Sequence, residues 1–412
     1  MQFHILSFEG PDHYARAGGL ATRVNGLAET LTSLGFETHV WFVGDPALPG
    51  TERHGQLHLH RWCQWVSKHH PAHVYDGELG KKAEYSASLP PFLAQEFILP
   101  HVEQGGRAVV LAEEWQTVDA VLHLHWLLRY QGIREKVTMM WNANNIFGFE
   151  QIPWPELATA ARITTVSRYM KHRMRDWGAD ASVIPNGLGA EAFDSPPRGA
   201  VAALRQRFRD RTVLSKMARW DPDKRWLDTI GLVAEMKRQD WRPLLVARGG
   251  AEEYGQDVLR AAHAQGLKIA DRAWTEPGAA GLLSAVRDVG DADIVNLESH
   301  VDPEARRVLF RSSDAVMANS GHEPFGLVGL EAMAAGGITC TGCSGEDYAV
   351  PGQNALVLET GDPREFMSLY RRLRGREDEV RRLRRAGQST ARRYAWRNVA
   401  EGVLLPRVEL GQ

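Results

Sequence analysis

The first 190 residues alternate between short, continuously apolar runs and stretches with helical spacing. An apolar run at 2–8 is followed by a segment whose apolar positions recur on one helical face: Leu20, Val24, Leu27, Leu31 and Leu34. Another apolar run at 36–44 completes a strand, glycine-rich loop, helix, strand unit. Further strands are predicted at 107–115, 137–145, 161–167 and 181–187. This order predicts a doubly wound α/β domain with a parallel sheet over residues 1–190.

A polar, proline-rich stretch at 190–201 predicts a linker, and a second series of the same kind follows it. Apolar runs predict strands at 212–220, 242–250, 291–297, 314–320, 336–342 and 354–359, with a helix at 224–239. The pattern predicts a second Rossmann-like domain over 200–389. Two such domains are expected to face a cleft lined by the carboxyl ends of both sheets, a usual place for a ligand.

The segment 370–405 is dense in arginine and carries Leu, Val and Ala at helical spacing. A basic amphipathic helix can lie on an anionic membrane. The acidic residues Glu377, Asp378 and Glu379 interrupt the basic run, which favours a solvated pair of helices. Whether these helices touch a membrane is left open by the sequence.

Composition and charge exclude several classes of function. The 412 residues carry a net charge of -2, which gives no overall field for nucleic acid or an anionic membrane. The partner is therefore expected to be a small molecule. The start MQFHILSFEG lacks a basic region and a long apolar run, and no stretch reaches the roughly 20 apolar residues of a membrane span. A cytoplasmic protein is expected.

Cysteine and histidine give little support for a metal site. Three cysteines are too few for a disulfide framework, and the C-x-x-C of Cys340 and Cys343 has no second pair or nearby histidine. His58 and His60 alternate along a predicted strand, and the histidines that follow fall in a loop. No metal and no other cofactor are expected.

Two segments carry positive charge beside a turn. Gly18 and Gly19 open the first helix next to Arg16, where free amides favour an anion, although a structural turn explains the glycines equally well. The segment is not G-x-G-x-x-G, which disfavours a dinucleotide oxidoreductase. In the second domain Arg219 ends a strand and Lys224 opens the next helix. Such a pair suits a diphosphate, and two surface cations beside two aspartates are the equal alternative.

The segment GHEPFGLVGLEAMAAGG, residues 321–337, places two glutamates eight residues apart around a helix start. Glu323 precedes the helix and Glu331 lies inside it, on the order of 10 Å further along. Between them the amides of Phe325, Gly326 and Leu327 offer an anion site. The layout matches a nucleotide sugar, with hydroxyls at both ends and phosphates between them. The alternative is a capping residue and an exposed helical acid.

This segment resembles the E-x7-E motif of retaining glycosyltransferases with the GT-B fold, in particular family 4 and the related glycogen and starch synthases. Six further segments resemble the same family in the same order: RAGGLA, LAEEWQT, ITTVSRYM, VIPNGL, ARWDPDK and AWRNVAEGVL. The resemblance implies that a terminal helix over 390–412 packs back on the first domain. It also implies same-face transfer of a sugar without a metal.

By this resemblance Arg219 and Lys224 hold the donor diphosphate, Glu323 contacts the transferring sugar and Glu331 holds the ribose. Gly18 and Gly19 approach the phosphates, and Gly249 lies in the region that meets the base. Glycogen synthases carry a His where this chain has Asn144, which cannot act as a base but can hydrogen-bond a sugar hydroxyl. Arg16 replaces a lysine and keeps its charge.

The expected acceptor residues are Glu114, Trp115 and Asn145, which follow first-domain strands; core packing explains Trp115 equally well. The sequence thus predicts a retaining transferase that moves a hexosyl group, most simply glucosyl, from a nucleoside diphosphate to a small hydroxylated or saccharide acceptor. A nucleotide-sugar epimerase, a phosphorylase and a non-catalytic nucleotide-sugar-binding protein are the alternatives. The base, the acceptor and the oligomeric state are not specified by the sequence.

Overall fold

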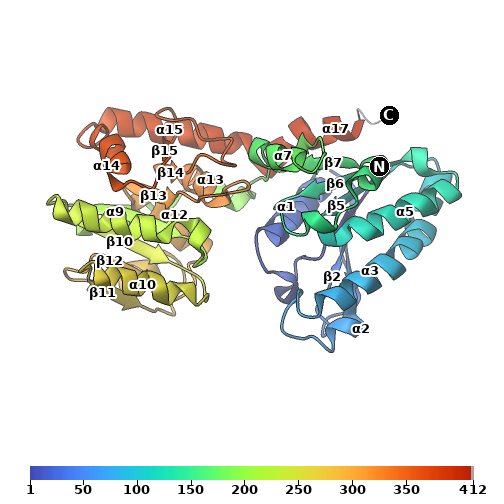
Figure 1. Cartoon of the computed structure of the whole chain (residues 1–412), viewed down its shortest axis with the longest axis horizontal. Helices are drawn as coiled ribbons and strands as arrows, with labels where there is room; N and C mark the ends of the chain where they lie inside the picture. The colour runs from blue at the N-terminus through green and yellow to red at the C-terminus, as the bar shows by residue number, and fades with distance from the viewer. Residues whose placement is uncertain (410–412) are drawn as a thin grey trace. The chain divides into compact units, whose positions relative to one another are not determined.

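The computed structural model describes residues 1–409 and divides into two compact units. The first unit comprises Met1–Gly187 and the chain from Trp396 onward, and the second comprises Leu188–Ala395. The last three residues of the predicted helix over 390–412 lie outside the described residues. Each unit contains one parallel sheet with helices on both faces (Figure 1), which confirms the predicted pair of Rossmann-like folds.

The first unit is built on an eight-stranded sheet of order β3-β4-β2-β1-β5-β6-β7-β8. All neighbouring strands are parallel except β3 and β4, which form an antiparallel hairpin at the edge. Its central strands are buried on both faces, the usual state of a parallel sheet. The strands are β1 Gln2–Leu6, β2 Glu37–Val43, β3 Thr51–His54, β4 Leu57–Trp62, β5 Ala108–Glu113, β6 Val137–Ala143, β7 Arg162–Thr165 and β8 Ser182–Val183.

Helices cover both faces of this sheet, with α3 against α5 on one face and α1 on the other. The longer ones are α1 Gly19–Ser33, α3 Glu78–Leu93, α5 Val118–Tyr130, α6 Trp154–Ala160 and α7 Arg168–Arg175. The short ones are η1 His13–Ala15, α2 Gln64–Ser67, η2 Ala94–Ile98, α4 Leu99–Glu103, η3 Trp115–Thr117, η4 Arg134–Lys136 and η5 Phe149–Gln151.

The end of the chain packs on α1 of the first unit. The elements α16 Trp396–Val399, η8 Ala400–Leu404 and α17 Leu405–Glu409 contribute Trp396, Val399, Leu404 and Val408 to the core that contains Val24 and Leu27. A Cβ at Gly26 would lie 2.0 Å from the Trp396 Nε1. A glycine in the middle of α1 is therefore required by the close approach of this indole.

The second unit is built on a seven-stranded sheet of order β11-β12-β10-β9-β13-β14-β15, in which every neighbouring pair is parallel. Alternate residues of its strands enter separate apolar cores on the two faces. The strands are β9 Thr212–Met217, β10 Pro243–Arg248, β11 Ile269–Arg272, β12 Ile294–Leu297, β13 Ala315–Ala318, β14 Thr339–Thr341 and β15 Leu356–Val357.

The helices of this unit lie on both sides of the sheet, with α9, α10 and α14 on one face and α8, α11 and α12 on the other. They are η6 Ala190–Phe193, α8 Arg198–Arg207, η7 Pro222–Lys224, α9 Trp226–Arg238, α10 Tyr254–Ala264, α11 Gly278–Ala285, α12 Pro303–Ser312, α13 Leu327–Ala334, α14 Pro363–Arg371 and α15 Glu377–Arg393. The predicted linker at 190–201 is largely taken up by η6 and α8.

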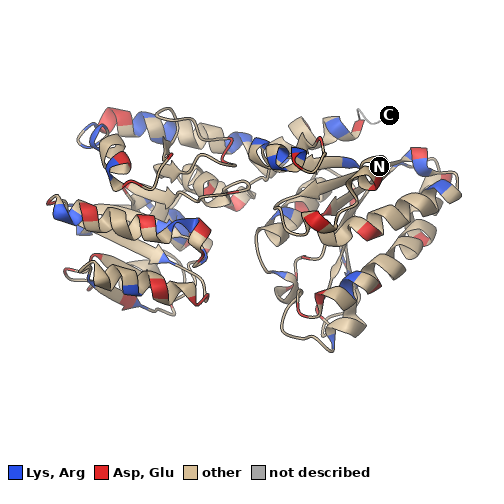
Figure 2. Cartoon of the chain, viewed as in Figure 1, with Lys and Arg blue, Asp and Glu red and all other residues tan. Residues whose placement is uncertain are grey.

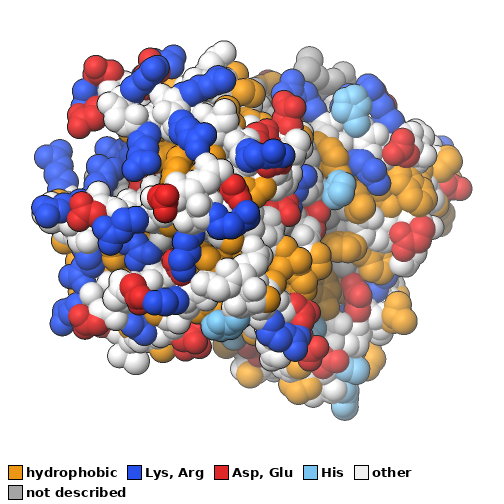
Figure 3. Space-filling view, turned by 60° about the vertical axis from the view of Figure 1, so that its left-hand side comes forward, with side chains coloured by type: hydrophobic (Ala, Val, Ile, Leu, Met, Phe, Trp, Pro, Cys, Tyr) orange, Lys and Arg blue, Asp and Glu red, His pale blue; other side chains and the backbone are white. Residues whose placement is uncertain are grey.

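The arginine-rich segment forms α14 and α15, and acidic residues compensate part of its charge (Figure 2). Arg381 pairs with Glu377 and Asp378, and Arg382 pairs with Glu379, all within α15. Basic and acidic side chains are likewise interspersed on the face shown in Figure 3. Among the described residues, no helix has the length and apolarity that a bilayer crossing requires.

A row of histidines runs across the first sheet, set by strand register. His4 lies opposite His39 in the pairing of β1 with β2, and His39 lies opposite His58 in the pairing of β2 with β4. The His39 and His58 rings stack with centroids 4.4 Å apart and an angle of 16° between their planes. The Nε2 atoms of His39 and His58 lie 3.3 and 3.7 Å from the Glu37 Oε1, so these three residues offer ligand atoms within 4.8 Å of one another that could hold a metal ion.

Burial of these rings predicts a stability loss in mild acid. Burial, reinforced by neighbouring histidines, lowers the pKa of His39 and of His60 from 6.5 to about 3. Between these values the unfolded chain binds protons that the folded chain does not, so stability is full above pH 6.5 and decreases as the pH falls. We expect the free energy of unfolding to drop between pH 6.5 and 5 by about 1.4 kcal/mol per pH unit for each such histidine.

Urea unfolding of the full chain at pH 7.5, 6 and 5 measures this slope. A His39→Gln variant removes one titrating ring and is expected to give a shallower dependence. An equal slope in the variant and the parent protein would contradict the assignment to the histidine row.

Candidate functional site

The two predicted donor residues Lys224 and Glu323 meet in the second unit. The Lys224 Nζ donates to the Glu323 Oε2 at 2.7 Å, and each side chain is 19% exposed. Lys224 ends η7, whose start is capped by the Asp221 carboxylate accepting from the Asp223 amide. Asp223 in turn accepts from the backbone amide of His322 at 2.9 Å. The turn after β9 and the loop after β13 are therefore held together, with a partly exposed cation and carboxylate at their junction.

A glycine-rich loop after β14 supports the backbone of Glu323. The Ser344 hydroxyl accepts from the Glu323 amide at 2.9 Å, and a Cβ at Gly345 would lie 2.1 Å from the Glu323 carbonyl oxygen. Glu346, 5% exposed, accepts from the Ser344 amide. Burial and the charge of Glu323 raise the pKa of Glu346 to about 7. Cys343, in the same loop, and Cys340 are free thiols.

The amides predicted to bind an anion lie at the start of α13. Gly326 precedes the helix with φ of 80°, a left-handed conformation that favours glycine, and its carbonyl accepts from the Tyr348 hydroxyl at 2.5 Å. Phe325 is buried and Leu327 is half-buried. Gly326 makes no side-chain capping hydrogen bond at this helix start. The amides predicted to cradle a phosphate belong to Gly326 and its two neighbours.

The remaining donor candidates in this unit have different surroundings. Glu331 accepts from Arg306 at 3.1 Å, and burial raises its pKa in spite of that arginine. Arg219 is exposed, and its carbonyl accepts from the Trp226 indole. Gly249 is buried under Trp220, where a Cβ would lie 1.8 Å from the ring. Close packing of that indole is a sufficient reason for the glycine.

In the first unit, an internal carboxylate occupies the start of α1. The Glu9 Oε2 accepts from the amides of Ala17, Gly18 and Ala21 at 3.2, 3.0 and 3.0 Å. The Glu9 Oε1 accepts from the Tyr75 hydroxyl at 2.7 Å, and Glu9 is 4% exposed. Arg16, Gly18 and Gly19 are exposed beside it. A phosphate approaching Gly18 has to compete with a carboxylate that is tethered in place.

Glu113 and Glu114, adjacent glutamates at the end of β5, contact different partners. Glu113 forms a buried ion pair with Arg23, 2.9 Å between the Nε and Oε1, and accepts from the side-chain amides of Asn142 and Asn144. Glu114 takes φ of 68° and accepts from the Asn144 backbone amide at 2.6 Å. Burial, aided by the charge of Glu113, raises the pKa of Glu114 to about 8. The Asn144 Oδ1 is buried and has no hydrogen-bond partner among the described residues.

The other acceptor candidates lie close by in the same unit. Trp115 is half-buried and packs on Gly148, where a Cβ would lie 2.4 Å from the ring. The Lys82 Nζ lies 5.2 Å from the Trp115 ring centroid. The Asn145 Oδ1 accepts from the Phe147 amide at 2.7 Å, a local turn contact. Asn145 therefore shapes the loop after β6, and Trp115 is held by packing.

Sequence reasoning missed Glu9, Arg23, Glu113 and Glu346 as functional candidates. All four are charged side chains with at most 5% exposure. A charged residue directly after an apolar strand run was the available signal for Glu9 and Glu113. Nothing local in the sequence marks Arg23 as the partner of Glu113.

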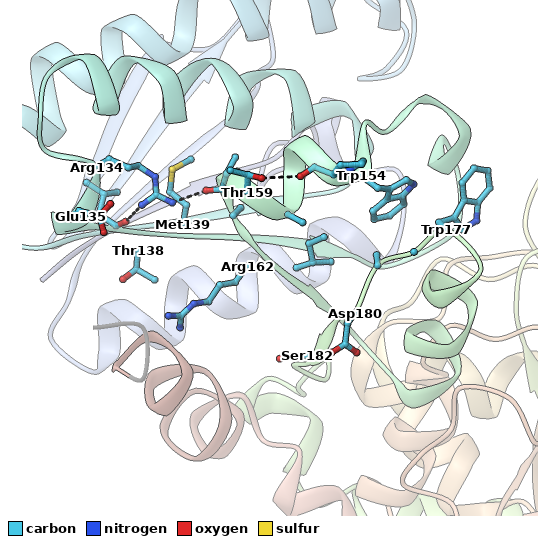
Figure 4. Close-up of a pocket in the computed structure, with 18 residues that line it drawn as sticks. Arg134, Glu135, Thr138, Met139, Trp154, Thr159, Arg162, Trp177, Asp180 and Ser182 are labelled. Atoms are coloured by element: carbon cyan, nitrogen blue, oxygen red, sulfur yellow. Dashed lines mark hydrogen bonds between the residues drawn. The ribbon is translucent and has the colours of Figure 1, made fainter.

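A groove of about 840 Å³ lies elsewhere on the first unit, between α6 and the amino ends of β6 and β7 (Figure 4). Arg134 stands at one end of it, where its guanidinium donates to the His125 Nδ1 and to the carbonyls of Val137 and Ala160. These contacts hold Arg134 in place within the fold. The groove is not at the carboxyl edge of the sheet, where ligands of this fold class bind.

Comparison with known proteins matches each unit to a glycosyltransferase model. Glycosyltransferase Family 4 matches residues 17–191, and Glycosyl transferases group 1 matches residues 280–390. D-inositol 3-phosphate glycosyltransferase of Segniliparus rotundus is 26% identical over 45% of this chain and 40% of that protein. The enzyme of the same name from Xylanimonas cellulosilytica is 24% identical over 74% of this chain and 69% of that protein.

Solved structures share the fold over the whole chain. Sucrose-phosphate synthase from Thermosynechococcus elongatus superposes with a TM-score of 0.69 at 18% identity, covering all of both chains. The catalytic domain of starch synthase IV from Arabidopsis thaliana gives 0.67 at 14% identity, over 99% of this chain and 98% of that one. The two sheets and these neighbours define the GT-B fold class. With one glycosyltransferase model on each unit, the chain belongs to the GT-B glycosyltransferases of family 4.

Proposed function

We propose that the protein is a cytoplasmic retaining hexosyltransferase that takes a hexosyl group, most simply glucosyl, from a nucleoside diphosphate sugar without a metal. The pairing of Lys224 with Glu323 beside the start of α13 carries this proposal. Within one unit, the Lys224 ammonium and the amides at the start of α13 can bind phosphate, and the Glu323 carboxylate can accept from sugar hydroxyls. A neighbouring solved structure is described as trehalose-6-phosphate from E. coli bound with UDP-2-fluoro glucose.

The donor is assigned to the second unit. Lys224 and the exposed Arg219 would hold the diphosphate and stabilise the charge that develops on the leaving group, an electrostatic role. Glu323 would accept from hydroxyls of the transferring sugar, and Glu331 would accept from the ribose while paired with Arg306. The amides that open α13 would complete the phosphate site.

The acceptor is assigned to the carboxyl edge of the first sheet. Asn144 is held by Glu113 and Glu114, which leaves its Oδ1 as an acceptor for a sugar hydroxyl. Glu114 with a pKa of about 8 is protonated at neutral pH and can therefore donate a hydrogen bond. The proposed acceptor is a small hydroxylated molecule or a saccharide.

A nucleoside diphosphate release assay tests the function. UDP-, ADP- and GDP-hexoses are each incubated with the full chain, with and without a panel of sugars, polyols and their phosphates. Release that depends on one donor and on an acceptor is the expected result, and the anomeric configuration of the product tests retention. Added chelator is expected to leave the rate unchanged. Donor binding without release under any acceptor would instead favour a non-catalytic binding protein.

A further inference from the structure

A lysine is buried beneath the candidate donor site. Lys216 lies one residue before the end of β9 and is 1% exposed. Its Nζ donates to the Asn319 Oδ1 at 3.0 Å and to the Met317 carbonyl at 3.3 Å. It also lies 5.4 Å from the centroid of the Trp226 ring. These contacts tie β9 to the end of β13, from which the chain continues to Glu323.

The charged groups around Lys216 come from three elements. Lys224 and Arg225 at η7 disfavour its charge, whereas Asp228 on α9 and the Cys340 thiol on β14 act in the opposite direction. Burial is the largest influence, and together these lower the pKa of Lys216 from 10.5 to about 7. Near neutral pH the side chain is therefore divided between the ammonium and the amine.

We propose that Lys216 is a positioning residue of the donor site whose proton is linked to donor binding: it takes up a proton when a nucleoside diphosphate binds at Lys224 and Arg219. The inference rests on the proposed function, because it assumes that the diphosphate binds there. The charge of Lys224 repels a proton on Lys216. A bound diphosphate adds further negative charge beside Lys224 and its partner Glu323, and this charge favours the buried ammonium.

The proposed linkage predicts the direction in which donor affinity changes with pH. Above pH 7 the free protein has lost the Lys216 proton in most molecules, whereas the complex keeps it. Binding then requires proton uptake, and donor affinity decreases as the pH rises, by up to about tenfold per pH unit. A Lys216 with only a structural role would contribute nothing to this slope.

Calorimetric titration of the full chain with UDP, ADP and GDP at pH 8 tests the linkage. Each titration is run in HEPES and in Tris, whose different ionisation enthalpies reveal protons taken up on binding. We expect uptake approaching one proton in the parent protein. Lys216→Met and Lys216→Gln are expected to bind without uptake; the Gln variant keeps N–H donors and guards against a folding defect in the Met variant.

Two further variants identify the group that takes up the proton. Lys237→Met removes another lysine of the same unit, in the last turn of α9 and paired with Asp293, and is expected to keep the uptake. Glu346→Gln removes the other nearby group with a pKa of about 7 and is also expected to keep it. Loss of uptake in Glu346→Gln with retention in both Lys216 variants would overturn the assignment to Lys216.

The remaining outcomes separate this inference from the proposed function. Binding of a nucleoside diphosphate by the parent protein without proton uptake overturns the linkage and leaves the glycosyltransferase proposal standing. Failure of UDP, ADP and GDP alike to bind overturns both.

Discussion

Lys224→Ala and Glu323→Ala variants are each expected to lose turnover by a factor of about 10² to 10³ while remaining folded. The Lys224 ammonium and the Glu323 carboxylate are 2.7 Å apart and partly exposed, so losing one of them does not strand a fully buried charge. In the proposed reaction Lys224 stabilises the departing diphosphate and Glu323 orients the sugar. Both interactions gain strength in the transition state, which places the loss in kcat more than in KM.

Lys237→Ala is the matched control for these variants. The Lys237 Nζ is also 2.7 Å from a carboxylate, that of Asp293, but the pair lies at the far end of α9. Near-normal turnover is expected in this control. Lys224→Arg and Glu323→Gln separate charge from shape, since the first keeps a cation and the second keeps a hydrogen-bonding oxygen. Near-normal turnover in Lys224→Ala or Glu323→Ala, with the donor found by the release assay, would refute the assignment of the site.

The fold was predictable because its signals are local. Apolar runs of strand length and one-sided helices recur in order along both halves, and each is defined by consecutive residues. The junction of Lys224 and Glu323 was predictable for a related reason. Each residue lies in the segment that follows a strand, and the carboxyl ends of adjacent parallel strands such as β9 and β13 meet at one edge of the sheet.

Contacts that depend on register or on distant partners were not predictable. The histidine row exists because His4, His39 and His58 share a register position on three neighbouring strands, which spacing within one strand cannot show. The carboxylate that fills the start of α1 comes from Glu9, before the intervening loop, and a glycine pair alone predicts only that some anion is favoured there. Glu113 and Glu114 are neighbours in sequence, yet the left-handed φ of Glu114 separates their environments.

Arg23→Met is expected to lower the free energy of unfolding of the first unit by about 3 to 5 kcal/mol. Arg23 and Glu113 are 3% and 2% exposed at the side chain, and the guanidinium also donates to the Asn186 Oδ1. Removing the arginine leaves the Glu113 carboxylate buried, with the side-chain amides of Asn142 and Asn144 as its donors among residues 1–409. A lone charge in such surroundings costs far more than a surface pair contributes.

Chemical denaturation of single and double variants tests whether loss of one partner of the buried ion pair destabilises the protein more than loss of one partner of a surface pair. The double variant Arg23→Met with Glu113→Leu removes both charges and is expected to be destabilised by less than the sum of the single changes. Lys171→Met breaks the Lys171 pair with Asp180, which is 82% exposed, and is expected to cost below about 1 kcal/mol. A loss in Arg23→Met no larger than that of Lys171→Met would contradict the buried pair. Glu113 also holds Asn144, which is assigned to the acceptor site. The double variant is therefore expected to have a higher KM for the acceptor and an unchanged affinity for the donor. A loss of stability alone does not produce this combination.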